Sequence, residues 1–234
     1  GRPLRLSSVR VCSPIPHPEQ DIICLGVNYA AHADESAQFD RKAFLLDRKK
    51  ATYFSKRAYQ TSGPDDLIPS YPELVTSLDY EAELAVIIGR DCKNVCERDA
   101  AACIFGYTVL NDVSARNLQT EHNQWYFGKS LDGFTPMGPC IVTEDEIPYP
   151  PALSISSTVN GELRQNSNTK YLLHSISEII AELSQGMTLL AGTIIATGTP
   201  AGVGMGFDPP KFLKSGDVVT CEIEKIGRLT NMVK

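Results

Sequence analysis

The stretch DYEAELAVIIG, residues 79–89, places two glutamates within what reads as a strand of a protein core. In an extended chain, residues two apart point to the same face, so Glu81 and Glu83 lie side by side, roughly 7 Å apart at the backbone. Two like charges beside the apolar run AVII are costly unless something offsets them. The alternation alone leaves two interpretations open: a metal site, or the solvated face of an amphipathic edge strand.

The remainder of the chain reads mainly as short strands. Asn160-Gly161 lies between two strand-like runs and is the strongest hairpin signal in the sequence. Further strands are predicted from runs of apolar and β-branched residues at 22–27, 107–114, 140–147, 192–199 and 217–227.

Two helices are predicted among these strands. Apolar residues recur at helical spacing over 171–186, where Ser175 and Glu178 are placed for a capping box. A second helix is predicted over 97–105, ended by Gly106. Because helices do not alternate regularly with strands, the sequence favours a β-rich α+β fold over a doubly wound α/β sheet.

Composition and charge exclude several classes of protein. The 234 residues carry a net charge of −6, which gives no electrostatic footprint for nucleic acid. No apolar run is long enough to span a bilayer, and the first residues lack the apolar stretch of a signal peptide. The seven cysteines are scattered, which predicts free, mostly buried thiols and a cytoplasmic protein. The basic clusters at 47–50 and 55–57 are predicted to be solvated.

The glycine-rich stretch TGTPAGVGMG, residues 197–206, does not fit a phosphate-binding loop. It lacks the GK[ST] of a P-loop, and the Pro pair in FDPPKF prevents a clean helix start after it. Two interpretations remain: a tight turn that lets backbone approach a ligand, or a plain structural turn.

Other polar residues have spacings that suit catalysis or metal binding. His32 and Glu35 are three residues apart, so on a helix they share a face. The Glu35 carboxylate could then orient the His32 imidazole for catalysis. The alternative is an exposed pair without function. Asp112, at the end of an apolar strand, would add a third oxygen donor to Glu81 and Glu83, a set that Mg²⁺ or Mn²⁺ prefers over zinc. Spacing alone does not show that the three acids converge.

Several segments resemble the fumarylacetoacetate hydrolase family, and they occur in the order found there. The resemblance covers residues 20–233, and the segments are LGVNYAAHADE, SLDYEAELAVIIG, VLNDVSARNLQ, GKSLDGFTPMGP, VNGELRQ and LLAGTIIATGTPAGVG. It implies a β-rich fold of stacked mixed sheets, commonly a homodimer, with a divalent metal, usually Mg²⁺ or Mn²⁺. Longer members carry a further N-terminal region; we expect residues 1–19 to be an extension, the remnant of such a region, and residues 20–234 to be the catalytic domain.

The resemblance also implies roles for individual residues. The metal ligands would be Glu81, Glu83 and Asp112; the water-activating pair on a lid would be His32 and Glu35; Lys129 would stabilise negative charge; substrate-side positions would be Arg116, Gln119 and Thr199. The animal enzyme that names the family takes a further carboxylate ligand near 26–29. This chain has Gly-Val-Asn-Tyr there, so it is more similar to the three-carboxylate branch of the family.

That branch implies chemistry on small 2-oxo acids. We expect a Mg²⁺- or Mn²⁺-dependent hydrolase that cleaves a C–C bond of a 2-oxo or 2,4-dioxo acid through a metal-stabilised enolate. The alternative within the branch is a decarboxylase or an isomerase/tautomerase of 2-oxo acids. The alternative from another class is a non-catalytic protein that binds a metabolite.

Overall fold

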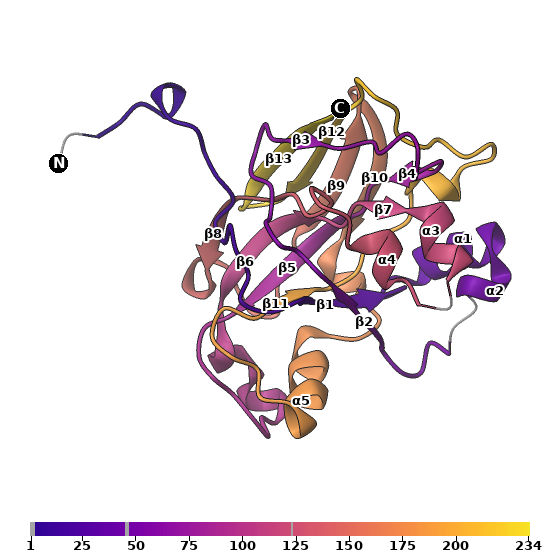
Figure 1. Ribbon diagram of the computed structural model, residues 1–234. Coiled ribbons are helices and arrows are strands. Elements are labelled where there is room, and N and C mark those ends of the chain that lie inside the picture. Colours follow the sequence, from indigo (N-terminus) through magenta and orange to yellow (C-terminus); the bar gives the residue numbers. More distant parts are fainter. Residues whose placement is uncertain (1–2, 45–46, 123) are drawn as a thin grey trace.

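The computed structural model describes residues 3–44, 47–122 and 124–234, which fold into mixed sheets with a few short helices (Figure 1). A six-stranded sheet has the spatial order β2 (Thr52–Lys56), β1 (Ile22–Gly26), β11 (Ile194–Ala196), β5 (Ala82–Ile88), β6 (Ile104–Asn111), β8 (Met137–Thr143). A five-stranded sheet has the order β10 (Glu162–Asn168), β9 (Ser154–Val159), β12 (Val218–Ile223), β13 (Gly227–Val233), β3 (Leu67–Ile68). A third, small sheet pairs β4 (Leu78–Asp79) with β7 (Ser114–Ala115). The β-rich α+β prediction is therefore confirmed.

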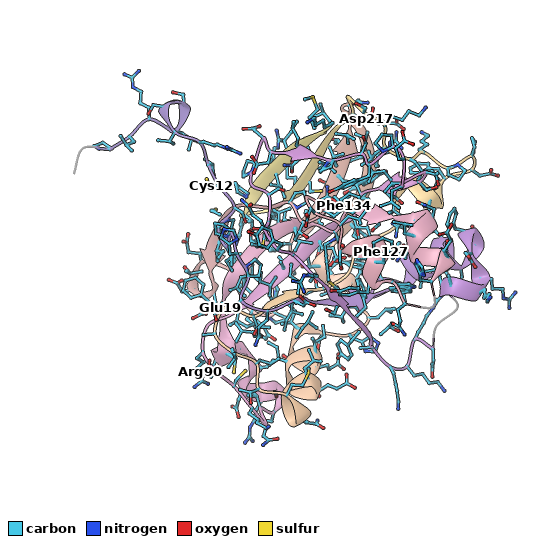
Figure 2. All side chains as sticks on the ribbon, viewed as in Figure 1. Cys12, Glu19, Arg90, Phe127, Phe134 and Asp217 are labelled. Carbon is cyan, nitrogen blue, oxygen red and sulfur yellow. The ribbon has the colours of Figure 1, made fainter. Side chains whose placement is uncertain are left out.

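The two larger sheets stack with β5 at the centre of the molecule. All seven residues of β5 are buried, because both of its faces are covered. On one face, Leu84 and Val86 pack in a cluster with Ile155 and Val219 of the five-stranded sheet. Ala85, on the opposite face, packs in a second cluster with residues of β1, β6 and β11. Figure 2 shows side chains filling the space between the strands, with the fully buried Phe134 among them.

Four of the helices gather at one end of the six-stranded sheet, and α5 lies at the other (Figure 1). Their bounds are α1 (Ala30–Phe39), α2 (Arg41–Phe44), α3 (Arg116–Glu121), α4 (Tyr126–Lys129) and α5 (Ile176–Gly186). In the described part of the chain, every helix is too short or too polar to cross a membrane. The first described residues carry a 3-10 helix at Leu6–Ser8 and extend away from the body in Figure 1, whereas Ser13 is already buried against it. The division at residue 19 stays a prediction.

The local predictions are confirmed at the hairpin and at α5. Asn160 and Gly161 both have positive φ and join β9 to β10, as a two-residue turn of the primed type requires. Ser175 caps α5 in a capping box with Glu178, and the helix runs to Gly186. All seven cysteines are free; four are buried and three are exposed.

Two other local predictions were wrong. Residues 97–103 form a 3-10 helix rather than an α-helix, and Ile104 already belongs to β6, where it pairs with Ile88. Tertiary pairing therefore overrides the helical propensity at the end of that segment. The strand predicted over 140–147 begins earlier, at Met137, and ends at Thr143, because the acidic run 144–146 turns into a 3-10 helix.

The capping box gives a direct test of how α5 is stabilised. Ser175 Oγ accepts a hydrogen bond from the Glu178 backbone N–H at 3.2 Å, and Glu178 Oε2 accepts one from the Ser175 N–H at 2.6 Å. We expect Ser175→Ala to lower the free energy of unfolding by about 1 kcal/mol, because one helix N–H loses its partner. Urea denaturation followed by circular dichroism measures this change, and an unchanged midpoint would contradict it.

Candidate active site

The two glutamates and the aspartate converge where β5 and β6 lie side by side. Glu81 directly precedes β5, Glu83 lies within it, and Asp112 follows β6. The pairing of Ala82 with Asn111 brings the acids together, and the Asp112 N–H donates to the Glu81 carbonyl at 2.9 Å. Ligand oxygens of the three acids lie within 4.8 Å of one another, and all three side chains are buried. The solvated edge-strand alternative is wrong, because β5 is a central strand.

Two cations offset the charge on Glu81. Lys129 Nζ donates to Glu81 Oε2 at 2.8 Å and to Asp112 Oδ2 at 2.6 Å. Arg116 Nη1 lies 2.7 Å from Glu81 Oε1 and donates to Gln119 Oε1 at 3.0 Å. Burial by itself would raise the pKa of Glu81, but the charges of Lys129 and Arg116 outweigh it and hold the pKa below its ordinary value. Glu81 is therefore an ionised carboxylate in a buried setting.

The negative charge of Glu83 is compensated much less than that of Glu81. Its Oε2 accepts one hydrogen bond from the Gly198 N–H at 2.8 Å. Burial, followed by the charges of Asp112 and Glu81, raises the pKa of Glu83 well above its ordinary value. A divalent cation would relieve this repulsion, and an all-carboxylate donor set suits Mg²⁺ or Mn²⁺. The residues present therefore fit such an ion.

His32 and Glu35 form a hydrogen-bonded pair on α1. His32 Nδ1 lies 2.8 Å from Glu35 Oε1, and His32 is buried despite its position on a surface helix. The Gly202 N–H donates to both oxygens of Glu35, at 3.2 and 3.0 Å, and thereby ties the carboxylate to the glycine-rich stretch. With the Nδ1–H directed to a carboxylate, Nε2 is the nitrogen that can act as a base, and Ser36 Oγ lies 3.4 Å from it. The pair is therefore not exposed, and its role in catalysis stays a prediction.

One small, partly enclosed cavity is lined by six of the nine residues that the sequence singled out: His32, Glu81, Arg116, Gln119, Lys129 and Thr199. Glu35, Glu83 and Asp112 are not part of its lining. Its free volume is about 10 Å³, room for about one water molecule. Phe44 and Trp125 lie against each other at its wall, with ring centroids 5.4 Å apart, and Phe44 also packs on Val203 and Met205. Phe44 and Trp125 therefore restrict the space beside His32 and Glu81 in the described structure. The lining residues are Leu25, Gly26, Val27, His32, Phe44, Phe54, Glu81, Arg116, Gln119, Trp125, Lys129 and Thr199.

The glycine-rich stretch packs against the start of β5 through Thr199. The Thr199 hydroxyl donates to the Ala82 carbonyl at 2.9 Å, and the stretch passes directly over the start of β5. Gly198 has φ +98, and a Cβ there would lie 2.8 Å from Asn28 Cβ, so glycine is required for this close approach. The stretch holds Glu35 and Glu83 through backbone N–H groups, and Thr199 lines the cavity; its approach to a ligand stays a prediction.

Sequence reasoning missed Lys56. The basic cluster 55–57 was predicted to be solvated, yet Lys56 is fully buried at the end of β2. Its Nζ donates to Asp112 Oδ1 at 2.7 Å, to the Val113 carbonyl at 3.1 Å and to the Lys129 carbonyl at 2.5 Å. The lysine is drawn inward because these acceptors use all three of its donors. The cluster at 47–50 is exposed, as predicted.

Sequence reasoning also missed Asp79. It is fully buried and accepts from Arg116 Nε at 2.9 Å and from the backbone N–H groups of Gly204 and Met205 at 2.6 and 3.0 Å. The only signal was its position two residues before Glu81, on the same face of the extended chain. Asp79 thus fixes both the arginine of the cavity and the turn against which Phe44 packs.

Residues 21–234 match the family described as fumarylacetoacetate (FAA) hydrolase C-terminal. The chain belongs to this family. Its fold and its three-carboxylate site agree with the resemblance read from the sequence.

Individual relatives carry different names. An oxaloacetate tautomerase of Bacillus subtilis is 46% identical over 97% of this chain and 74% of its own length. The structure of a fumarylacetoacetate hydrolase from Exiguobacterium antarcticum has a TM-score of 0.84 at 45% identity, covering 97% of this chain and 78% of that one. The structure of a 5-carboxymethyl-2-hydroxymuconate delta-isomerase from Mycobacterium smegmatis has a TM-score of 0.81 at 38% identity, covering 100% and 84%. Two of these three names describe isomerisations.

Proposed function

We propose that this chain is an enzyme that interconverts the keto and enol forms of a small 2-oxo dicarboxylic acid of the oxaloacetate type. One observation carries the proposal: a base, His32, and two cations, Lys129 and Arg116, line the same small cavity. Proton transfer at a carbon next to a carbonyl needs a base for the proton and positive charge for the oxygen that becomes negative. The name of the Bacillus subtilis relative describes the same reaction.

The side chains of the cavity would divide the work. His32 Nε2 removes a proton from the carbon beside the 2-oxo group, while Glu35 holds the imidazole and stabilises its charged form. The Lys129 ammonium stabilises negative charge on the oxygen. Arg116 and Gln119 bind a substrate carboxylate, for which the buried Arg116 Nη2 has a free donor in the described structure. Returning the proton from the imidazolium to the oxygen completes the enol.

Glu81, Glu83 and Asp112 would hold the divalent ion, Mg²⁺ or Mn²⁺, beside this cavity. When bound, the ion supplies Lewis-acid polarisation of the 2-oxo group. The burial of these side chains strengthens the electrostatic interactions between them.

A second candidate is hydrolysis of a C–C bond in a 2,4-dioxo acid. It is favoured by the cavity's room for about one water molecule beside His32, which could activate that water instead of taking a proton from carbon. The name of the Exiguobacterium antarcticum structure describes a hydrolase of this kind.

One assay separates the two candidates. Purified protein with Mn²⁺ is mixed with freshly dissolved enol oxaloacetate, and the ultraviolet absorbance of the enol is followed; a parallel reaction with an acylpyruvate is followed by pyruvate release. We expect accelerated loss of the enol without pyruvate from the acylpyruvate. Pyruvate release with no effect on the enol would replace tautomerisation by hydrolysis.

Replacing His32 by glutamine tests the base. We expect His32→Gln to lower the rate of keto–enol conversion by about 10²-fold, because general base catalysis contributes on this order. Mn²⁺ affinity, measured by calorimetry, is expected to stay within a few-fold. His17→Gln, at an exposed histidine, is the matched control. Wild-type activity in His32→Gln would exclude this residue as the base.

Assembly and location remain predictions. The homodimer is tested by light scattering of the purified chain, and a monomeric mass would contradict it. The cytoplasmic location is tested by fractionating cells of the source organism.

A further inference from the structure

We propose that Gln165, on the five-stranded sheet, is a positioning residue that holds the start of β5 and the Thr199 turn in the geometry that the active site needs. The inference rests on the proposed function, since it concerns the residues of that site. Gln165 lies in the VNGELRQ segment, for which neither the sequence nor the site described above gives a role.

A β-bulge turns Gln165 inward. In a regular strand, Leu163 and Gln165 would point to the same face. The register between β10 and β9 shifts at this point: Leu163 pairs with Thr158 and Gln165 with Ser157, which leaves Arg164 as the extra residue. As a result, Leu163 is 57% exposed while Gln165 is fully buried. Because of the bulge, the Gln165 side-chain amide points into the space between the sheets and not into solvent.

The side-chain amide of Gln165 makes four hydrogen bonds. Its Oε1 accepts from the Ala82 N–H at 3.0 Å and from Ser157 Oγ at 2.9 Å. Its Nε2 donates to Thr199 Oγ1 and to the Pro200 carbonyl, both at 2.7 Å. Since a backbone N–H only donates and a carbonyl only accepts, Ala82 and Pro200 fix which end of the amide faces which. A buried glutamine that is saturated in this way is held in one orientation.

These contacts reach both sides of the proposed metal site. Ala82 stands between Glu81 and Glu83, so the peptide that Gln165 holds sets the direction of both carboxylates. Thr199 Oγ1 also donates to the Ala82 carbonyl, which closes a small network around that residue. Among the described residues, Gln165 lies behind Thr199 and outside the lining of the cavity. It therefore acts through other residues and not by touching substrate.

The same bulge supports the residue that holds the proposed base. Gly202, with φ +103, lies against the bulge so closely that a Cβ there would overlap the Arg164 carbonyl. The N–H of Gly202 donates to Glu35, which holds His32. The five-stranded sheet thus supports the site through one side chain and one backbone contact.

Gln165→Met tests the proposal, since methionine keeps the size and removes the four hydrogen bonds. Three quantities are measured: the Mn²⁺ dissociation constant by calorimetry, kcat and KM for the enol acid, and the melting temperature. We expect the Mn²⁺ dissociation constant to rise about 10- to 100-fold, as is typical when a residue that orients metal ligands is lost, and kcat to fall. The matched control is Gln185→Met, at an exposed position of α5, which should leave both constants unchanged.

A second variant keeps the test decisive if Gln165→Met does not fold. Ser157→Ala removes one of the four hydrogen bonds, and among the described residues Gln165 is the one hydrogen-bond partner of the Ser157 hydroxyl, which lies outside the cavity lining. We expect a several-fold rise in the Mn²⁺ dissociation constant. The inference would be overturned if folded Gln165→Met, or Ser157→Ala in its place, had a lower melting temperature but wild-type Mn²⁺ affinity and kcat. The proposed function would then remain intact. Absence of Mn²⁺ binding by the wild-type chain would instead overturn the proposed function, and the inference with it.

Discussion

Replacing Glu83 by glutamine is expected to lower metal-dependent turnover on the order of 10³-fold. Glutamine keeps the size of the side chain and an oxygen for the Gly198 N–H, but it removes one of three charges that converge within 4.8 Å. Losing the ion would forfeit several kcal/mol of stabilisation of the developing negative charge, and each 1.36 kcal/mol is about tenfold in rate. Keto–enol conversion with and without Mn²⁺ measures the loss, and calorimetry measures Mn²⁺ binding directly.

The same variant is expected to be more stable than the wild-type chain when both are free of metal. Burial, and then the charges of Asp112 and Glu81, raise the pKa of Glu83 in the folded state, so the folded state binds the proton more tightly than the unfolded state. Wild-type stability therefore falls as pH rises from the ordinary carboxyl range through the folded-state pKa. Glutamine does not titrate, so the advantage of the variant should grow across this window.

Urea denaturation at several pH values, in the presence of a chelator, measures this difference. The matched control is Glu73→Gln, at an exposed position, which should change neither turnover nor stability. Full activity of Glu83→Gln with undiminished Mn²⁺ affinity would exclude Glu83 as a ligand. Lower stability at neutral pH would contradict the electrostatic argument.

Replacing Asp79 by alanine is expected to lower the free energy of unfolding by about 3–5 kcal/mol, which is typical when one partner of a buried ion pair is removed. The Arg116 guanidinium would remain buried with Glu81 as its one acidic partner, and the N–H groups of Gly204 and Met205 would lose their acceptor. A domain is stable by only about 5–15 kcal/mol, so this single change removes a large share. Chemical denaturation measures the loss.

Two comparisons make this prediction specific. Asp145→Ala, at an exposed aspartate, should leave the free energy of unfolding within about 0.5 kcal/mol of wild type. Asp79→Asn keeps one oxygen for the backbone N–H groups and is expected to lose less than Asp79→Ala. A wild-type denaturation midpoint for Asp79→Ala would show that Arg116 does not depend on this partner.

Patterns local in sequence were predictable because neighbouring residues set them. The positive φ angles required at Asn160 and Gly161, and the reciprocal hydrogen bonds of Ser175 and Glu178, involve residues at most three apart. The shared face of Glu81 and Glu83 follows from the period of an extended chain. The family resemblance added the fold and the candidate residues, since its motifs occur in a fixed order over nearly the whole chain.

Contacts between distant segments decided which charged side chains of the site are buried and which groups compensate them. Whether Glu81 and Glu83 face solvent or the protein interior depended on β5 being a central strand, and that is set by β6 and β11 pairing on either side of it. Lys56 is drawn inward by acceptors 56 or more residues away, so a local reading of charge could only predict a solvated side chain. The sequence by itself determined which carboxylates share a face. The tertiary structure decided what offsets them, because burial and charge compensation depend on every segment that packs around the site.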